Sequence, residues 1–276
     1  MMSIPADCNI ADDVNARLGL ALEAARQAGL ITLEYFRRSW LAVERKADDS
    51  PVTAADREAE QHLRQCIAQA YPHDAILGEE FPQQPGTTGY TWILDPIDGT
   101  KSFIHGVPLY GTMIGIEYRG HTTAGVIHIP ALKETVYAAR GQGAWYQHDD
   151  QTPQRARVSQ TPSLSEGLFL TSEVENFYRT GRRGAYERLQ AASRLSRSWG
   201  DCYGYMLVAT GRAEVMVDPI AAVWDLAALA PIIEEAGGRF GDWQGRPTIY
   251  SGEAVAANAL VFDEVLALLS GDDSAP

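Results

Sequence analysis

The segment Asp95-Pro96-Ile97-Asp98-Gly99-Thr100 constrains this chain more than any other feature. It follows Tyr90-Thr91-Trp92-Ile93-Leu94, an apolar and aromatic run that is typical of a buried β-strand. The proline and the glycine favour a turn directly after that strand. Two carboxylates in one short turn form a compact group of hard oxygen ligands, the kind that Mg²⁺ prefers. The segment therefore predicts a divalent-cation site at the end of a buried strand.

Other acidic residues also stand at the ends of predicted elements. Glu79 and Glu80 follow a short strand near residues 75–77, and Asp225 begins a helix. Carboxylates that follow strands can meet at one edge of an open α/β sheet, where such folds place their ligands. Each acid alone can equally be a solvated surface group or a helix N-terminal group. If they converge, their mutual repulsion is costly without a cation.

The pattern of helices and strands predicts a layered α/β architecture. A chain of 276 residues, 45% of them hydrophobic, can bury a large core as a single domain, residues 1–276. We expect an N-terminal α+β lobe over 1–148, which holds the metal site, and a C-terminal α/β substrate lobe over 166–276. The polar segment 149–165 is the expected join. A helix over 224–236 is expected to kink at Pro231.

Composition excludes several classes of partner. The net charge of −13 disfavours nucleic acid and anionic membrane as partners, although a bound metal can still attract an anionic substrate. The cysteines Cys8, Cys66 and Cys202 show neither a zinc spacing nor a disulfide framework. Met1 to Pro5 shows no secretory pattern, and no apolar run approaches a membrane span. We expect a soluble, cytoplasmic protein.

Four acidic motifs in a fixed order resemble one family. The chain contains Asp56, then Glu79-Glu80, then Asp95 to Thr100, then Trp224-Asp225-Leu226-Ala227-Ala228. This order is similar to that of the inositol monophosphatase family, the lithium-sensitive, Mg²⁺-dependent phosphatases, over roughly residues 20–260. The resemblance implies a five-layer αβαβα sandwich of the inositol monophosphatase/fructose bisphosphatase type. It also implies a homodimer, inhibition by Li⁺, and two or three Mg²⁺ ions per site, with Mn²⁺ as an alternative.

The resemblance assigns roles to individual residues. The implied metal ligands are Glu79, Asp95, the Ile97 carbonyl, Asp98 and Asp225. Thr100, supported by Asp56 and with Glu79 as a further catalytic group, would hold and activate the attacking water. Backbone N–H groups of Gly99 and Thr100 would bind phosphate. The roles of Glu80 and Lys46 are less defined, because Lys46 lies one residue closer to Asp56 than in animal inositol phosphatases. Such a site needs neither a histidine nor a covalent nucleophile.

Asp56 has a structural alternative. Thr53-Ala54-Ala55-Asp56 matches a helix capping box, in which the acid satisfies a backbone N–H group. The two roles are compatible.

The second half of the chain must select the leaving group. Gly200, Asp201 and Cys202 fall where animal inositol phosphatases contact the inositol ring, and Asp218 falls where they have a glutamate. Two acids at these positions favour a cationic group over a neutral polyol. Alternatively, Asp201 is a helix N-cap and Asp218 a turn residue before Pro219.

Several short segments resemble the histidinol-phosphatase branch of the family. They are Ser50 to Asp56, Lys101 to Pro108, Gly200 to Tyr203 and Glu234 to Arg239. The expected reaction is therefore hydrolysis of a small phosphate monoester, histidinol phosphate, to histidinol and phosphate in histidine biosynthesis. The alternatives are an inositol monophosphatase and a 3′(2′),5′-bisphosphate nucleotidase, which needs a nucleotide pocket that the sequence does not identify. A catalytically silent metal-binding scaffold is the non-enzyme alternative.

Overall fold

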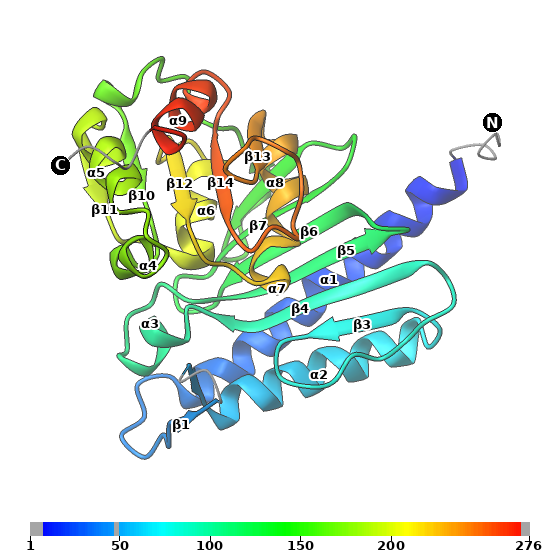
Figure 1. The fold of residues 1–276 in the computed structure, drawn as a ribbon. Helices are drawn as coiled ribbons and strands as arrows, with labels where there is room; N and C mark the ends of the chain where they lie inside the picture. The colour runs from blue at the N-terminus through cyan, green and yellow to red at the C-terminus, as the bar shows by residue number, and fades with distance from the viewer. Residues whose placement is uncertain (1–7, 47–49, 272–276) are drawn as a thin grey trace.

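The chain folds into five layers (Figure 1). The computed structural model describes residues 8–46 and 50–271, so the expectation for Met1 to Pro5 lies outside the described residues. A pair of long helices covers a seven-stranded sheet, a middle layer of helices follows, and a five-stranded sheet lies beneath an outer layer of helices. The predicted αβαβα sandwich is confirmed.

The helices belong to three layers. The first layer consists of α1 Cys8–Tyr35 and α2 Ala54–Ala70. The middle layer consists of α6 Asp201–Ala209, α7 Val223–Leu226 and α8 Leu229–Glu235. The outer layer consists of α4 Val174–Arg179, α5 Arg183–Ala192 and α9 Phe262–Leu269. Two short helical segments stand apart from these layers, α3 Thr100–Ile104 and the 3₁₀ turn η1 Leu164–Glu166.

The strands form two sheets and one short ribbon. The seven-stranded sheet contains β3 Ala75–Gly78, β4 Tyr90–Asp98, β5 Gly111–Tyr118, β6 His121–Ile129, β7 Glu134–Ala139, β8 Ala144–His148 and β9 Gln154–Arg155, in this order. The five-stranded sheet contains, in spatial order, β11 Leu195–Arg197, β10 Leu168–Leu170, β12 Val215–Asp218, β14 Ala254–Asn258 and β13 Gly238–Gly241. The ribbon pairs β1 Glu44–Arg45 with β2 Pro51–Val52.

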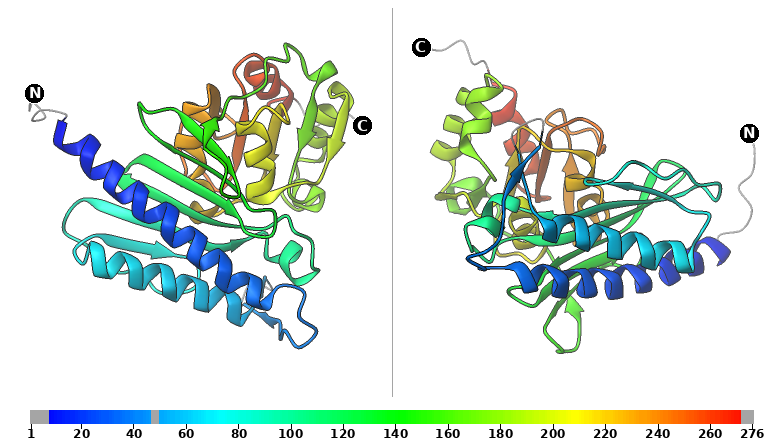
Figure 2. Two further views of the ribbon diagram at one scale, coloured as in Figure 1. Left: turned by 180° about the vertical axis from the view of Figure 1, so that it is seen from behind. Right: turned by 90° about the horizontal axis from the view of Figure 1, so that it is seen from below.

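The first two helices lie side by side on one face of the seven-stranded sheet (Figure 2). The inward face of α2 carries Ala55, Ala59, Leu63 and Ile67, spaced four residues apart and fully buried. Ala59, Leu63 and Ile67 pack with Trp92 and other strand residues into one apolar cluster, and Ala55 belongs to a second cluster with Ile97 and Phe103. This packing fixes the start of α2, which carries Asp56, beside the sheet.

Strand β4 runs further than the sequence predicts. We expected a turn from Asp95, but the strand continues through Asp98, with irregular pairing to β5 between these two residues. The Thr112 hydroxyl of β5 donates to the Pro96 carbonyl at 2.9 Å, which holds the proline segment extended. The chain turns only at Gly99, whose φ of 84° favours glycine. The irregular pairing lets both aspartates face the same site.

The middle layer presses directly on the seven-stranded sheet. A Cβ added at Gly125 of β6 would lie 2.2 Å from the Ala228 carbonyl oxygen, so only glycine permits this approach. The predicted single helix over 224–236 is instead two helices, α7 and α8. The break falls at Ala227 and Ala228 because Pro231 cannot donate to the Ala227 carbonyl, and its ring would clash with it.

The segment 149–165 runs from one sheet to the other. It contributes β9 to the edge of the first sheet and then leads through η1 to β10 of the second. Helix α8 contacts strands of both sheets, so the two-lobe division stays a prediction. None of the described helices combines the length and apolar character needed to cross a bilayer.

Candidate active site

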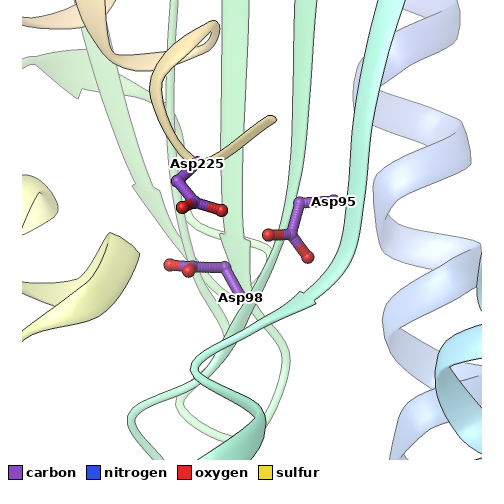
Figure 3. A group of neighbouring side chains, drawn as sticks. All are labelled: Asp95, Asp98 and Asp225. Atoms are coloured by element: carbon purple, nitrogen blue, oxygen red, sulfur yellow. The ribbon is translucent and has the colours of Figure 1, made fainter. Parts of the chain in front are cut away.

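Three carboxylates converge where β4 meets the middle helical layer. Asp95 and Asp98 come from β4 and Asp225 from α7, and their side chains point toward one another (Figure 3). One oxygen of each lies within 4.8 Å of the other two. The sequence predicts this meeting of residues that are far apart in the chain.

Backbone N–H groups hold each of these carboxylates in place. Asp95 Oδ1 accepts from the Ile97 N–H at 3.1 Å, and Asp225 Oδ2 accepts from the Ala222 N–H at 2.7 Å. Asp98 Oδ2 accepts from the Cys202 N–H at the start of α6. Among the described residues, no backbone N–H donates to the second oxygen of any of the three carboxylates.

Burial of so many acids together is electrostatically costly. Burial, and then the neighbouring carboxylates, raise the pKa values of Asp95 and Asp98 well above their usual range. Burial also raises the pKa of Asp225 to about 6, with Glu79 adding to the effect. A cation would remove this penalty and restore the charged forms. The donor set, carboxylate oxygens within one small space, fits a hard divalent cation.

Glu79 and Glu80 share one lysine beside this group. Lys46 Nζ lies 2.7 Å from Glu79 Oε1 and 2.6 Å from Glu80 Oε1. Burial would lower the pKa of Lys46, but its bonds to the two glutamates raise the pKa above its ordinary value. In the described part of the chain, Glu79 is thus paired with an ammonium group and lies outside the tight trio of aspartates. Its role as a metal ligand stays a prediction.

Asp56 forms the capping box that the sequence allows. Its Oδ2 accepts from the Thr53 N–H at 2.8 Å and from the Thr53 hydroxyl at 2.7 Å. Its Oδ1 is buried and has no partner among the described residues. Burial raises the pKa of Asp56 to about 6. One oxygen is therefore structural, and the other is an unsatisfied acceptor close enough to sense the charges of Glu80 and Glu79.

Thr100 is tied to the backbone of the aspartate segment. Its hydroxyl donates to the Ile97 carbonyl at 3.0 Å, so that carbonyl already has one donor. Within residues 8–46 and 50–271, no hydrogen bond joins Thr100 to Asp56. Their joint action on a water molecule stays a prediction.

One cavity of about 420 Å³ joins the predicted metal and substrate residues. Its lining comes from both halves of the chain, and includes Glu79, Asp98, Gly99, Thr100, Asp201, Asp218 and Asp225. A volume in this range suits a small organic ligand.

Asp201 and Asp218 both line this cavity, but their carboxylates differ in the hydrogen bonds that they accept. Asp218 accepts four hydrogen bonds, from the Thr171 hydroxyl, the Ser172 N–H, the Ser172 hydroxyl and the Tyr205 hydroxyl, at 2.9–3.3 Å. No backbone N–H of the described residues donates to the Asp201 carboxylate. Burial, with the charges of Asp218 and Asp225, raises the pKa of Asp201 to about 7. The Ser172 hydroxyl and the charge of Lys101 act in the opposite direction on this pKa, so Asp201 has fewer donors than Asp218 and is the acid more open to a ligand.

Both structural alternatives for these acids are wrong. The N-cap of α6 is Gly200, and Asp201 is the first helical residue, with a φ of 52°. Asp218 is the buried last residue of β12 rather than a turn residue. A left-handed backbone at a non-glycine residue beside a ligand cavity is a pattern found at functional sites.

Gly200 and Cys202 shape the site through their backbones. A Cβ at Gly200 would lie 2.1 Å from Ser172 Cα, so glycine is required there. The Cys202 thiol is buried, and its contribution to the site is the N–H that holds Asp98. Contact of either side chain with substrate stays a prediction.

Sequence reasoning missed several residues of the cavity. Ser172 connects Asp218 to the Asp201 backbone N–H, to which its hydroxyl oxygen lies at 2.8 Å. Asn176 and Ile220 line the cavity, as do Lys101 and Glu173, which form an ion pair at 2.5 Å. Isolated polar residues of this kind give no spacing signal in a single sequence.

Comparison with known proteins agrees with this geometry. A sequence model of the inositol monophosphatase family matches residues 13–271. A histidinol-phosphatase of Chlorobaculum parvum is 46% identical over 92% of this chain and 97% of its own length. A histidinol-phosphatase of Mycobacterium tuberculosis is 39% identical over 92% and 97%. The solved structure of a Thermotoga maritima IMPase superposes with a TM-score of 0.82 at 31% identity, over 92% and 96% of the two chains.

Fold, site and relatives together define a hydrolase of phosphoric monoesters. The chain belongs to the inositol monophosphatase family. This is a family of generally metal-dependent phosphatases that act on small phosphate monoesters. The acidic cluster of β4 and α7 is consistent with that dependence.

Proposed function

We propose that this phosphatase hydrolyses histidinol phosphate to histidinol and phosphate, with Mg²⁺ as cofactor. The observation that carries the proposal is the state of Asp201. This acid lies in the same cavity as Asp98 and Asp225, and among the described residues no backbone N–H donates to its carboxylate, whereas Asp218 accepts four hydrogen bonds. An ammonium group on the carbon next to the ester CH₂ is a matching partner for such an acid.

The proposed ligands for Mg²⁺ are Asp95, Asp98 and Asp225, with Glu79 and the Ile97 carbonyl as further ligands. Bound divalent ions, Mg²⁺ or alternatively Mn²⁺, would supply Lewis acidity toward water and phosphate and neutralise the carboxylates. The chain holds these ligands ready through the Ile97, Ala222 and Cys202 N–H groups. Because the ligands are prepositioned, little rearrangement is needed on binding.

The residues after Asp98 are proposed to handle phosphate and the attacking water. Backbone N–H groups of Gly99 and Thr100 would donate to phosphate oxygens. The Thr100 hydroxyl proton is directed to the Ile97 carbonyl, which leaves the lone pairs of Oγ1 to accept a hydrogen bond from the attacking water and so orient it. Asp56, whose Oδ1 has no partner among the described residues, would support this water by taking up the proton that it loses on attack.

The leaving group is proposed to lie against Asp201. Histidinol phosphate carries an ammonium group on the carbon next to the ester CH₂. The charge of an ionised Asp201 would stabilise that ammonium group in an enclosed site, where electrostatic attraction is stronger than in water. Asp218 would act mainly by fixing Ser172 and Tyr205, because its oxygens already accept four hydrogen bonds.

The relatives that support this proposal are the histidinol-phosphatases. One observation favours inositol monophosphatase as a second candidate: the hydroxyls of Ser172 and Ser198 line the same cavity and suit a polyol. Steady-state kinetics on histidinol phosphate, inositol 1-phosphate, a 3′,5′-bisphosphate nucleotide and p-nitrophenyl phosphate separate the candidates. We expect histidinol phosphate to have the highest kcat/KM; a roughly tenfold preference for inositol 1-phosphate would refute the proposal.

Two controls complete this experiment. Asp201→Asn should lower kcat/KM for histidinol phosphate more than for p-nitrophenyl phosphate, since the latter has no ammonium group. Equal losses on both would contradict recognition of the cation by Asp201. Binding of Mg²⁺ without phosphate release from any of these esters would favour the silent scaffold.

A further inference from the structure

Lys101 and Glu173 form an ion pair in the lining of the substrate cavity. Lys101 Nζ lies 2.5 Å from Glu173 Oε2, and both residues belong to that lining. Among the described residues of the lining, Lys101 is the one cationic side chain, and the other charged residues are acids. The two side chains are 63% and 37% exposed, so solvent reaches both. Because an exposed ion pair contributes little to stability, a ligand can open this one.

Close packing places Glu173 beside Asp201. A Cβ added at Gly200 would lie 2.1 Å from Ser172 Cα, and the Asp201 N–H donates to the Ser172 hydroxyl at 2.8 Å. Asp201 and Glu173 are the residues that follow Gly200 and Ser172 in the chain. The contact between these two segments therefore brings the backbones of two cavity acids close together.

The start of α3 lies against the same two acids. A Cβ added at Gly99, the N-cap of α3, would lie 3.0 Å from Asp201 Oδ2. Lys101 is the second residue of α3, and its side chain contacts Glu173. Burial raises the pKa of Asp201, and the charge of Lys101 acts in the opposite direction. Both acids therefore interact with the same cation, Glu173 by direct contact and Asp201 through its charge.

Glu173 is the acid of the lining that the proposed function leaves without a role. The aspartate cluster contributes two of the other acids. Glu79 is paired with a lysine outside the lining, and Asp218 accepts four hydrogen bonds. Asp201 is the proposed site of the substrate ammonium group. The leaving group of histidinol phosphate has one further donor, the imidazole N–H, which is present whether the ring is neutral or protonated.

We infer that Glu173 accepts a hydrogen bond from the imidazole ring of the substrate, and that Lys101 holds Glu173 until the ring displaces it. This inference rests on the proposed function. In histidinol phosphate one CH₂ group separates the ring from the carbon that bears the ammonium group. The two N–H-bearing groups of the substrate are thus neighbours, as Glu173 and Asp201 are in the cavity. Glu173 is a specificity-determining residue, and Lys101 is a positioning residue that competes with the ring.

The two partners of the ion pair should therefore change specificity in opposite directions. Substitution of Glu173 removes the acceptor that the ring needs. Substitution of Lys101 removes the cation with which the ring competes. An ion pair with a purely structural role would give the same result whichever partner is removed, because either substitution breaks the same contact.

O-Phosphoethanolamine tests this difference, because it carries the ammonium group at the same spacing from the phosphate and has no ring. The measured quantity is the ratio of kcat/KM for histidinol phosphate to kcat/KM for O-phosphoethanolamine, in which effects common to both substrates cancel. Glu173→Ala should lower this ratio about tenfold, through loss of a hydrogen bond to a charged group. Lys101→Met should raise it about threefold, because the ring no longer has to displace an exposed ammonium group.

Lys133 and Asp149 provide a matched control, since they form an ion pair at 2.9 Å with 65% and 45% exposure. Lys133→Met and Asp149→Ala should leave the ratio unchanged. A ratio that does not fall in Glu173→Ala, or does not rise in Lys101→Met, would overturn this inference and leave the proposed function intact. A wild-type preference for inositol 1-phosphate over both ammonium substrates would overturn the proposed function, and this inference with it.

Discussion

Asp74 and Asp95 are buried to nearly the same extent, yet their pKa values are shifted in opposite directions. Asp74 is 1% exposed and Asp95 is 2% exposed. Asp74 accepts two bonds from Arg17, at 2.8 and 3.1 Å, and further bonds from the Thr88 hydroxyl and the Trp92 indole. These bonds lower the pKa of Asp74 despite burial, whereas burial and neighbouring acids raise that of Asp95.

The difference shows which buried acids the protein neutralises by itself. Arg17 is held between the rings of Tyr71 and Tyr90, 4.2 and 3.7 Å from their centroids, so the counter-ion of Asp74 is part of the fold. Asp95 has no cationic side chain beside it among the described residues; its nearest charges are acids. Trp92 and Asp95 belong to the same strand, β4. The Trp92 indole donates to Asp74, the acid that the fold neutralises, whereas Asp95 belongs to the group of acids that the fold leaves without a counter-ion.

The largest expected effect is the loss of catalysis when an acid of the aspartate cluster is replaced. Asp98→Asn should lower metal-dependent turnover by about 10³-fold or more, because a metal ligand worth several kcal/mol to the transition state is weakened. Initial rates at saturating Mg²⁺ measure this effect, and circular dichroism checks the fold. The exposed Asp149, paired with Lys133, gives the control: Asp149→Asn should keep wild-type turnover. Substantial turnover of Asp98→Asn at saturating Mg²⁺ would contradict the ligand assignment.

Substitution of Asp74 should instead change the stability of the fold. Asp74→Asn should lower the free energy of unfolding by roughly 3–5 kcal/mol, because it leaves the Arg17 guanidinium buried without its counter-ion. The folded fraction should keep its kcat, since Asp74 is absent from the cavity lining. Denaturant unfolding and kinetics on the same sample test both statements. A loss of kcat without a loss of stability would show that Asp74 acts in catalysis rather than in stability, contrary to this prediction.

The sequence predicts the local elements and the aspartate cluster, but not the features that depend on long-range pairing. Apolar runs predict β3 and β4, the capping box predicts the start of α2, and the ordered acids predict the aspartate cluster, because these signals are local. The extension of β4 to Asp98 depends on β5, which pairs with Asp98 through Gly111 and bonds the Pro96 carbonyl through Thr112. No local pattern reports such long-range pairing.

The two substrate acids show the same limit. Asp201 and Asp218 look alike in sequence, and each was given a role in binding the leaving group. Asp218 takes its four donors from Thr171, Ser172 and Tyr205, residues that β10 and α6 bring to it from elsewhere in the chain. Only the fold distinguishes a satisfied acid from an available one.

The pH dependence of stability sharpens the comparison. In metal-free protein the pKa values of Asp225 and Asp201 are raised to about 6 and about 7. The folded state therefore binds more protons than the unfolded state between about pH 4 and pH 7, so stability is highest at the acidic side and falls as pH rises. We expect the melting temperature in EDTA to fall by about 4 °C or more from pH 5 to pH 7.5.

Saturating Mg²⁺ should remove most of that fall, because cations that neutralise the cluster favour its charged form at neutral pH. Melting curves at matched ionic strength, with and without Mg²⁺, provide the measurement. Asp74 acts in the opposite direction, because its pKa is lowered and its contribution is lost only as pH falls through that lowered value. Metal-free stability that rises between pH 5 and 7.5 would show that the acids are compensated within the chain.

The smallest expected effect comes from the same substitution at the two substrate acids. Asp218→Asn should destabilise the metal-free protein by about 1 kcal/mol, because a carboxylate that accepts four hydrogen bonds becomes an amide whose N–H groups face donors. Asp201→Asn should leave stability unchanged or raise it, because it removes one charge from a group of repelling acids. Chemical denaturation in EDTA compares the pair directly. If both variants lose the same stability, Asp201 is as well satisfied by the chain as Asp218, and its availability to a cationic leaving group is refuted.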